Sequence, residues 1–339
     1  MYNPCLLITN REAFGMVGLQ TENTLAIRTS AFSSAEEAAL QKANFQAKPK
    51  DRPYKEMPLE FNRCTLTLRR DTILLMQKGQ GTKIEYMEQC ARSAYIASMC
   101  QSKALFDLSA AAQIQQPADR DYVKLNCRLR WQAENLEQGL QYVPLDLSMA
   151  KLIVFMDSSF ANNQDLSSQL GYLIVLANKD AHSRQYVHSY PDSYLDSTFN
   201  IWGNVVYWSL TKCKRITQSV LASETYGMVS GVNIAIAILT TLKMITECLG
   251  LPSIPLIVCM DSYSLYECLV KLGTTNENQL MIDIMALCQS YKRCKITEIQ
   301  WINSNNNPTD AFTKAMPNQA LEQFINSNKL SIQVEGSVQ

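Results

Sequence analysis

Four acidic residues occupy positions where a carboxylate is costly unless it serves a purpose. Asp157 directly follows the apolar run KLIVFM, and Asp261 stands in the same relation to PLIVCM. Glu224 lies in a long helical pattern with apolar residues and glycines around it, so its carboxylate projects from an apolar face. Asp310, in NNPTDAFTK, is predicted at the third position of a helix that Pro308 opens.

Each acid taken alone also has a structural explanation. Asp157 is typical of a turn at a strand end, and Asp261 of an N-cap for the helix that follows it. Asp310 suits the first turn of a helix, where the helix dipole favours an acid. The four acids together indicate a shared site. Two of them end strands, one lies on the helix between these strands, and one begins the last helix, so all four can converge on one edge of a sheet.

Such a convergence predicts a cation site made of oxygen ligands. Clustered carboxylates with no basic neighbour repel one another, and their pKa values rise unless a divalent cation lies among them. The chain has only two histidines, His182 and His188, and no C-x-x-C pair, which argues against zinc. Oxygen ligands alone favour Mg²⁺, with Mn²⁺ as a substitute. Two such ions about 3.5 to 4 Å apart would bridge a phosphodiester and generate hydroxide, which is nuclease chemistry.

The elements that must position these acids follow the order β-β-β-α-β-α-β-α. The runs KLIVFMD, QLGYLIVLAN and VVYWSL predict three strands, and a long helix is predicted from about Ser219 to Cys248. PLIVCMD and KITEIQWI predict two more strands, with helices between and after them. We therefore expect an α/β domain at 148–330 with a mixed five-stranded sheet and flanking helices, an exposed loop insertion at 179–200, and a tail at 331–339.

The composition sets limits on the class of protein. The chain has 339 residues, which predicts about two domains. Its 31 Lys and Arg balance 31 Asp and Glu, which argues against holding nucleic acid by bulk charge. The eleven cysteines are scattered through apolar runs, so we expect reduced thiols and an intracellular protein, cytoplasmic or nuclear. The apolar GMVSGVNIAIAILTTL contains Asn233 and follows Glu224, which favours a buried core helix and no membrane association.

Together, the contexts of the four acids resemble the ribonuclease H domain of copia-type LTR retrotransposon polyproteins, particularly those of fungi. The segments that carry the resemblance are MDSSF, QSVLASETYG, VCMDSYSLY and NPTDAFTK, with WSLTKCKR, MIDIMALCQSY and IQWI as further matches. The resemblance covers about 151–330. It implies a ribonuclease H-like fold in which Asp157, Glu224, Asp261 and Asp310 are catalytic and hold two Mg²⁺ ions.

The resemblance also implies a substrate, an RNA–DNA hybrid. It places Lys212, Lys214 and Arg215 near the phosphates, although a solvated basic turn explains them equally well. Ser158 and Ser262, each next to an implied metal ligand, complete the expected substrate-binding set. Two stretches depart from the family pattern: the insertion at 179–200, and TNENQLMID, where the family usually has basic residues.

The first part of the chain resembles another region of the same polyproteins. FGMVGLQTENTLAI resembles the strand-turn-strand of a reverse transcriptase palm, whose turn carries two adjacent aspartates, and Glu22 and Asn23 take that place here. ARSAYIASMCQSKALFDLSAAAQ resembles the connection to ribonuclease H. Residues 1–147 are interpreted as a truncated palm remnant with thumb and connection. We expect this α+β remnant to lack polymerase activity, and other parts of the polyprotein to be partners.

Three hypotheses follow from the sequence. The first is a Mg²⁺-dependent endoribonuclease that cleaves the RNA strand of RNA–DNA hybrids. The second is a degenerate retrotransposon relic that acts as a nucleic-acid or protein interaction module, which the truncated palm favours. The third is a resolvase or exonuclease of the same fold, distinguished by cleavage of junctions or DNA.

Overall fold

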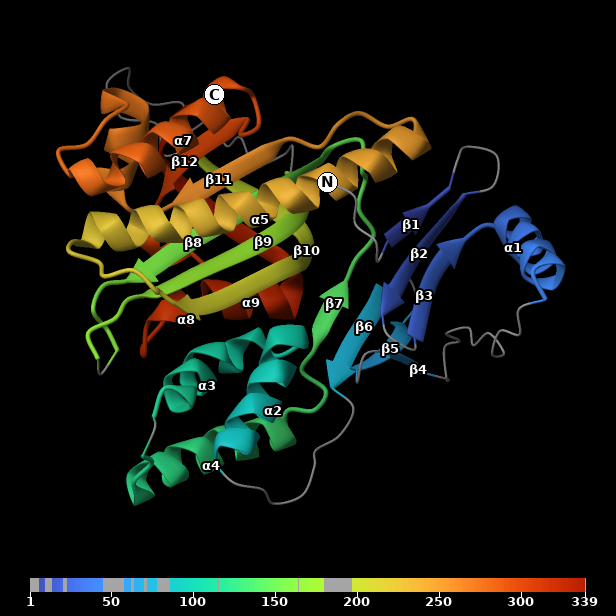
Figure 1. Cartoon of the computed structure of the whole chain (residues 1–339), viewed down its shortest axis with the longest axis horizontal. Coiled ribbons are helices and arrows are strands. Elements are labelled where there is room, and N and C mark those ends of the chain that lie inside the picture. The colour runs from blue at the N-terminus through green and yellow to red at the C-terminus, as the bar shows by residue number, and fades with distance from the viewer. Residues whose placement is uncertain are drawn as a thin grey trace.

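The computed structural model describes residues 6–9, 14–20, 23–44, 58–61, 64–69, 72–77, 86–114, 116–163, 165–179 and 197–338. Within these residues the chain is a mixed α/β protein. Two small antiparallel sheets and a group of three helices precede a large mixed sheet, which a long helix crosses (Figure 1).

The first small sheet holds the predicted strand-turn-strand. It consists of β1 (Leu6–Ile8), β2 (Gly15–Gln20) and β3 (Asn23–Arg28), and α1 (Ser30–Lys42) follows it. The antiparallel register pairs Gln20 with Asn23 across the turn. Asn23 is thus the first residue of β3, whereas Glu22 lies outside the described residues.

The second small sheet and three helices complete the first part of the chain. The sheet consists of β4 (Leu59–Phe61), β5 (Cys64–Arg69), β6 (Thr72–Gln77) and β7 (Leu140–Tyr142). The helices are α2 (Tyr86–Met99), α3 (Leu105–Ala112) and α4 (Asp119–Glu134), and the short 3-10 turn η1 (Ser102–Ala104) connects the first two. The helices pack on the large sheet. One contact between them is a hydrogen bond of 3.1 Å, which the Trp208 indole N–H of β10 donates to the Ala97 carbonyl of α2.

The large sheet has six strands rather than the expected five. These are β8 (Ala150–Ser159), β9 (Gln169–Lys179), β10 (Ser197–Lys212), β11 (Leu256–Met260), β12 (Glu298–Ile302) and β13 (Lys329–Val338). β8, β11 and β12 run parallel, and the other pairs are antiparallel. β10 pairs with both β9 and β13, so the sheet closes into a ring in the order β10-β13-β12-β11-β8-β9.

Two expected boundaries are wrong, and both errors concern this sheet. Residues 331–338, expected as a tail, form most of β13, where Leu330, Ile332 and Val334 alternate into the core. The expected insertion at 179–200 is shorter than its polar sequence suggests, because residue 179 ends β9 and residues 197–200 begin β10. Residues 180–196 lie outside the described part of the chain.

Helices pack against the large sheet and form two hydrophobic cores with it. They are α5 (Val220–Leu249), α6 (Tyr263–Glu267) with its π-helical continuation η2 (Cys268–Leu272), the 3-10 turn η3 (Asn278–Leu280), α7 (Met281–Lys292), the 3-10 turn η4 (Ser304–Asn306), α8 (Asp310–Thr313) and α9 (Ala320–Ser327). Phe155 and Ile332 belong to one core, together with Leu108 of α3 and Phe324 of α9, whereas Val154 belongs to the other core with Met228 of α5. β8 is therefore covered on both sides, which explains its continuous apolar run.

The long helix α5 crosses the outer face of the sheet (Figure 1). Ser219 caps its first turn by accepting from the Ala222 N–H at 3.0 Å, and Gly250 ends it at a φ of +69°. Its first half is buried against the sheet, while later side chains such as Met244 are exposed. Among the described residues it is the one helix long and apolar enough to cross a membrane by length and composition.

Candidate active site

Asp157 lies two residues before the end of β8 and is 3% exposed. The Thr313 hydroxyl of α8 donates to one of its carboxylate oxygens. Burial, and next the negative charge of Asp261, raise the pKa of Asp157 to about 6. A buried carboxyl whose pKa is raised is costly to ionise, and such groups gather at functional sites.

Asp261 follows β11 directly and comes beside Asp157 through strand register. β8 and β11 are parallel, and Met156 pairs with Met260, so the two aspartates are the next residues of adjacent strands. Burial raises the pKa of Asp261, while the positive charge of Lys314 opposes that rise. The expected alternative for Asp261, an N-cap, is wrong, because Ser262 is the N-cap of α6.

Glu224 reaches the same site from α5 and is 8% exposed. The backbone N–H of Ser158 hydrogen-bonds its carboxylate, so β8 anchors both Asp157 and Glu224. Burial and then the charges of Asp157 and Asp261 raise the pKa of Glu224 well above its usual range. The predicted projection of this acid from an apolar helix face is therefore what the structure shows.

Gly227 lets α5 approach β8 closely enough for this contact. A Cβ built on Gly227 would lie 2.3 Å from the Ser158 Oγ. Ser158, predicted to bind substrate, thus has its hydroxyl buried against α5, where it has no hydrogen-bond partner among the described residues. The closeness of helix and strand is what brings the Glu224 carboxylate to the end of β8.

We expect Gly227→Ala to lower the free energy of unfolding by about 1 to 3 kcal/mol, as overpacking does. In a helix interior alanine is otherwise favoured over glycine by about 1 kcal/mol, so a net loss reports the contact with Ser158. Urea unfolding measures it. The double variant Gly227→Ala/Ser158→Ala removes the obstructing hydroxyl and should recover most of the loss, and an unrecovered loss would place the clash elsewhere.

Asp310 is the first residue of α8, not the third, because this helix has only four residues and begins after Pro308 and Thr309. The side chain is 4% exposed. One carboxylate oxygen accepts from the Asn318 N–H at 2.7 Å, and the other forms an ion pair with Lys314. Asp310 is therefore fully engaged with protein donors.

Lys314 is a site residue that sequence reasoning missed. It pairs with Asp310. Burial lowers the pKa of Lys314, but the hydrogen bond to Asp310 and the charges of the acids outweigh it and raise that pKa. The acids therefore have a basic neighbour, contrary to the assumption under which the cation site was predicted. A signal for it exists in NPTDAFTK, where a lysine four residues after the aspartate lies within reach of it.

The structure thus brings all four acids together, with each carboxylate accepting a hydrogen bond from the protein. The donors are Thr313 for Asp157, Ser158 for Glu224, Asn307 for Asp261, and Asn318 with Lys314 for Asp310. In the described part of the chain, no group of three Asp, Glu, His or Cys side chains is arranged so that it could hold a metal ion. The set fits Mg²⁺ by chemistry, since its four side chains offer only carboxylate oxygens, and burial raises the pKa of three of them.

The basic residues predicted near the phosphates lie at the end of β10 and beyond it. Lys212 forms an ion pair with Asp165, and Arg215 pairs with Asp283 at 3.1 Å. The Arg215 guanidinium also stacks over the Tyr226 ring. Lys214 is exposed. Two of the three cations are thus neutralised by acids in this structure.

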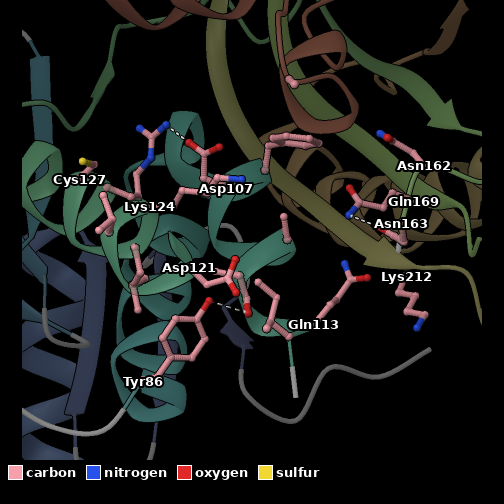
Figure 2. A pocket seen from close by; sticks show the side chains of 18 of the residues that line it. Tyr86, Asp107, Gln113, Asp121, Lys124, Cys127, Asn162, Asn163, Gln169 and Lys212 are labelled. Atoms are coloured by element: carbon pink, nitrogen blue, oxygen red, sulfur yellow. Dashed lines mark hydrogen bonds and ion pairs between the residues drawn. The ribbon is translucent and has the colours of Figure 1, made fainter. Parts of the chain in front are cut away.

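A cavity of about 1230 Å³ separates α3 and α4 from the edge of the large sheet where β9 begins and β10 ends. Figure 2 shows Asp107, Lys124 and Gln113 on the helical side, facing Asn162, Asn163, Gln169 and Lys212. Its charged walls are paired internally, since Arg128 pairs with Asp107 and Lys212 with Asp165. The Asn162 amide donates to the Thr313 carbonyl at 3.0 Å, which ties the cavity wall to the segment that holds Asp157.

No protein-family model and no curated protein matches this chain. Two solved structures show weak likeness, the native prototype foamy virus protease-reverse transcriptase and a foamy viral protease-reverse transcriptase in complex with RNA/DNA hybrid. Their TM-scores are 0.25 and 0.24, with 11% and 12% identity. Each likeness covers 80% of this chain, which spans only 39% of those proteins. A likeness this weak defines neither family nor activity.

Proposed function

We propose that residues 148–338, which include β13, form a ribonuclease H-like domain that cleaves the RNA strand of RNA–DNA hybrids with two Mg²⁺ ions. The observation that carries the proposal is the register of β8 and β11, which sets Asp157 and Asp261 side by side at the ends of adjacent parallel strands. Glu224 and Asp310 approach the same point from α5 and α8. The sequence resemblance to copia-type retrotransposon polyproteins supplies the substrate class.

The raised pKa values support a site built for cations. Burial raises the pKa of Asp157, Glu224 and Asp261 alike, and each of these acids is further affected by the charge of its neighbours. Bringing such groups together costs stability unless a cation is bound. Structural acids are normally arranged to avoid this cost, and functional sites are where perturbed pKa values gather.

Asp157, Glu224, Asp261 and Asp310 would hold the ions, with Mn²⁺ as a substitute. Bound Mg²⁺ supplies charge to neutralise the phosphate and lowers the pKa of a bound water. The chain supplies the alignment: β8 and β11 fix the two central aspartates, and the Ser158 N–H orients Glu224. By the resemblance, Glu224 serves the substrate side and Asp310 the side of the attacking water.

The choice of RNA over DNA would come from contacts with 2′-hydroxyls, which only RNA carries. The cavity presents the amide side chains of Asn162, Asn163 and Gln169, which donate and accept hydrogen bonds, and Asn162 connects it to α8 through the Thr313 carbonyl. Lys212, Lys214 and Arg215 would contact phosphates once Lys212 and Arg215 leave their acidic partners. Residues 1–147 are proposed as a reverse transcriptase remnant without polymerase activity.

Incubating the full chain with a hybrid labelled on its RNA strand tests the proposed activity. We expect cleavage of the RNA strand with Mg²⁺ and none with EDTA. The same assay with duplex DNA, a DNA four-way junction and single-stranded RNA separates a ribonuclease H from a resolvase or an exonuclease. Metal-dependent cleavage of the junction or the DNA alone would replace the proposed activity with one of these.

A second candidate is a catalytically degenerate retrotransposon relic that serves as a nucleic-acid or protein interaction module. The feature that favours it is the engagement of every carboxylate with a protein donor, with a lysine among them. Hybrid binding that neither needs Mg²⁺ nor leads to cleavage would support this candidate.

A further inference from the structure

Lys314 is placed where a cation is needed. It follows directly after α8, whose other end carries Asp310 and whose last residue, Thr313, donates to Asp157. Its ammonium pairs with Asp310, and Asp157 and Asp261 are close enough to act on its charge. Four buried or nearly buried carboxylates thus share one positive side chain.

The surroundings of Lys314 leave its side chain free to move. It is 47% exposed, whereas the side chain of its partner Asp310 is 6% exposed. Lys314 has the extended backbone of a C-cap, at φ −121° and ψ 144°, so α8 ends at this residue. The ammonium can therefore withdraw into solvent by rotating the side chain, while the carboxylates stay fixed to β8, β11, α5 and α8.

We propose that Lys314 is a built-in counter-cation, which holds the acid cluster together in the metal-free protein and must withdraw when a divalent cation binds. The inference rests on the proposed function, because it assumes that the four acids hold metal ions. It explains why each acid is satisfied by the protein and why no three of the described side chains stand ready for an ion. Lys314 is then a positioning residue, which acts on the reaction through the ligands.

The inference gives two effects of opposite sign for Lys314→Met, a neutral side chain of similar length. In EDTA at pH 8 the variant should lose several degrees of melting temperature, because the acids lose their counter-charge. Its affinity for Mg²⁺, measured by calorimetry without substrate, should increase by roughly tenfold or more, because no ammonium competes at close range. A purely structural lysine would lower both stability and metal affinity when removed.

Three further variants make the test specific. Lys314→Arg keeps the charge and should keep most of the melting temperature in EDTA. Asp310→Asn/Lys314→Met removes one charge of each sign and should recover much of the stability lost by Lys314→Met. Lys243→Met is the matched control, since Lys243 also lies four residues from an acid, Glu247, but both are exposed on α5. It should change neither readout.

The outcomes separate this inference from the proposed function. Equal or weaker Mg²⁺ binding by Lys314→Met, with a wild-type chain that binds Mg²⁺ and cleaves hybrid, overturns the inference alone. An unchanged melting temperature in EDTA overturns it too. A Lys314→Met chain that folds only when Mg²⁺ is present supports it. Binding of Mg²⁺ by neither protein, together with no cleavage, overturns the proposed function on which the inference rests.

Discussion

Replacing Asp157 or Asp261 with asparagine should abolish hybrid cleavage while making the metal-free protein more stable. Aspartate and asparagine have nearly the same shape, so the strand ends and the contact of residue 157 with Thr313 are retained. The loss of a metal ligand should reduce the cleavage rate by at least about a thousandfold, since metal clamps contribute several kcal/mol to such transition states. Single-turnover cleavage of a labelled hybrid measures this effect.

The stability arm of this prediction comes from the raised pKa of Asp157. A carboxyl whose pKa is raised from 3.8 to about 6 loses up to about 3 kcal/mol of favourable interaction when it ionises. Asp157→Asn removes that cost at pH 7.5, so urea unfolding in EDTA should shift to higher urea. Glu247→Gln, which removes an exposed acid near the end of α5, is the control. Retained cleavage by Asp157→Asn would refute the site assignment.

Two short apolar runs are enough to predict the central pair of acids. KLIVFM and PLIVCM are continuous because β8 and β11 are covered on both faces, by one hydrophobic core on each face. Residues that follow such runs lie at the carboxyl edge of the strands, and parallel pairing puts them at one level. Glu224 was predictable for a related reason, since an acid on the buried face of a helix needs compensation.

The parts that local pattern did not predict depend on contacts between distant segments. β13 pairs with β10 and β12, more than a hundred and about thirty residues away respectively in sequence. The ion pair of Arg215 with Asp283 joins residues that no spacing relates. Such pairings depend on how the strands assemble into the closed sheet, and local sequence patterns do not contain that information.

Lys314 is a different kind of omission, because its signal is local. Its four-residue separation from Asp310 was available, but Asp310 was assigned to the third position of a longer helix. In the structure α8 is a single turn, so Asp310 and Lys314 lie at its two ends and both meet the strand ends. For locating the site around Asp310, the lysine four residues later is therefore more informative than the position of Asp310 in its helix.

Without metal, the protein should lose stability as the pH rises from 5 to 8, and Mg²⁺ should reverse this dependence. The pKa of Asp157 is higher in the folded protein than its ordinary value of 3.8, so the folded state binds more protons between about pH 4 and 6. The unfolding free energy therefore falls as the pH rises through that window, by up to about 3 kcal/mol in total, of which about half is lost above pH 5. The raised pKa values of Glu224 and Asp261 act in the same direction.

Bound Mg²⁺ requires ionised carboxylates, so its contribution grows as they lose their protons, and stability with Mg²⁺ should rise over the same interval. Urea unfolding at pH 5, 6, 7 and 8, in EDTA and in Mg²⁺, measures both slopes. Asp165 does not contribute to these slopes. The hydrogen bond from Lys212 lowers its pKa to about 2, so it stays ionised at all four pH values. Asp157→Asn should flatten the EDTA slope. A metal-free protein that becomes more stable toward pH 8 would show that these acids carry no buried charge, and the cation site would lose its physical basis.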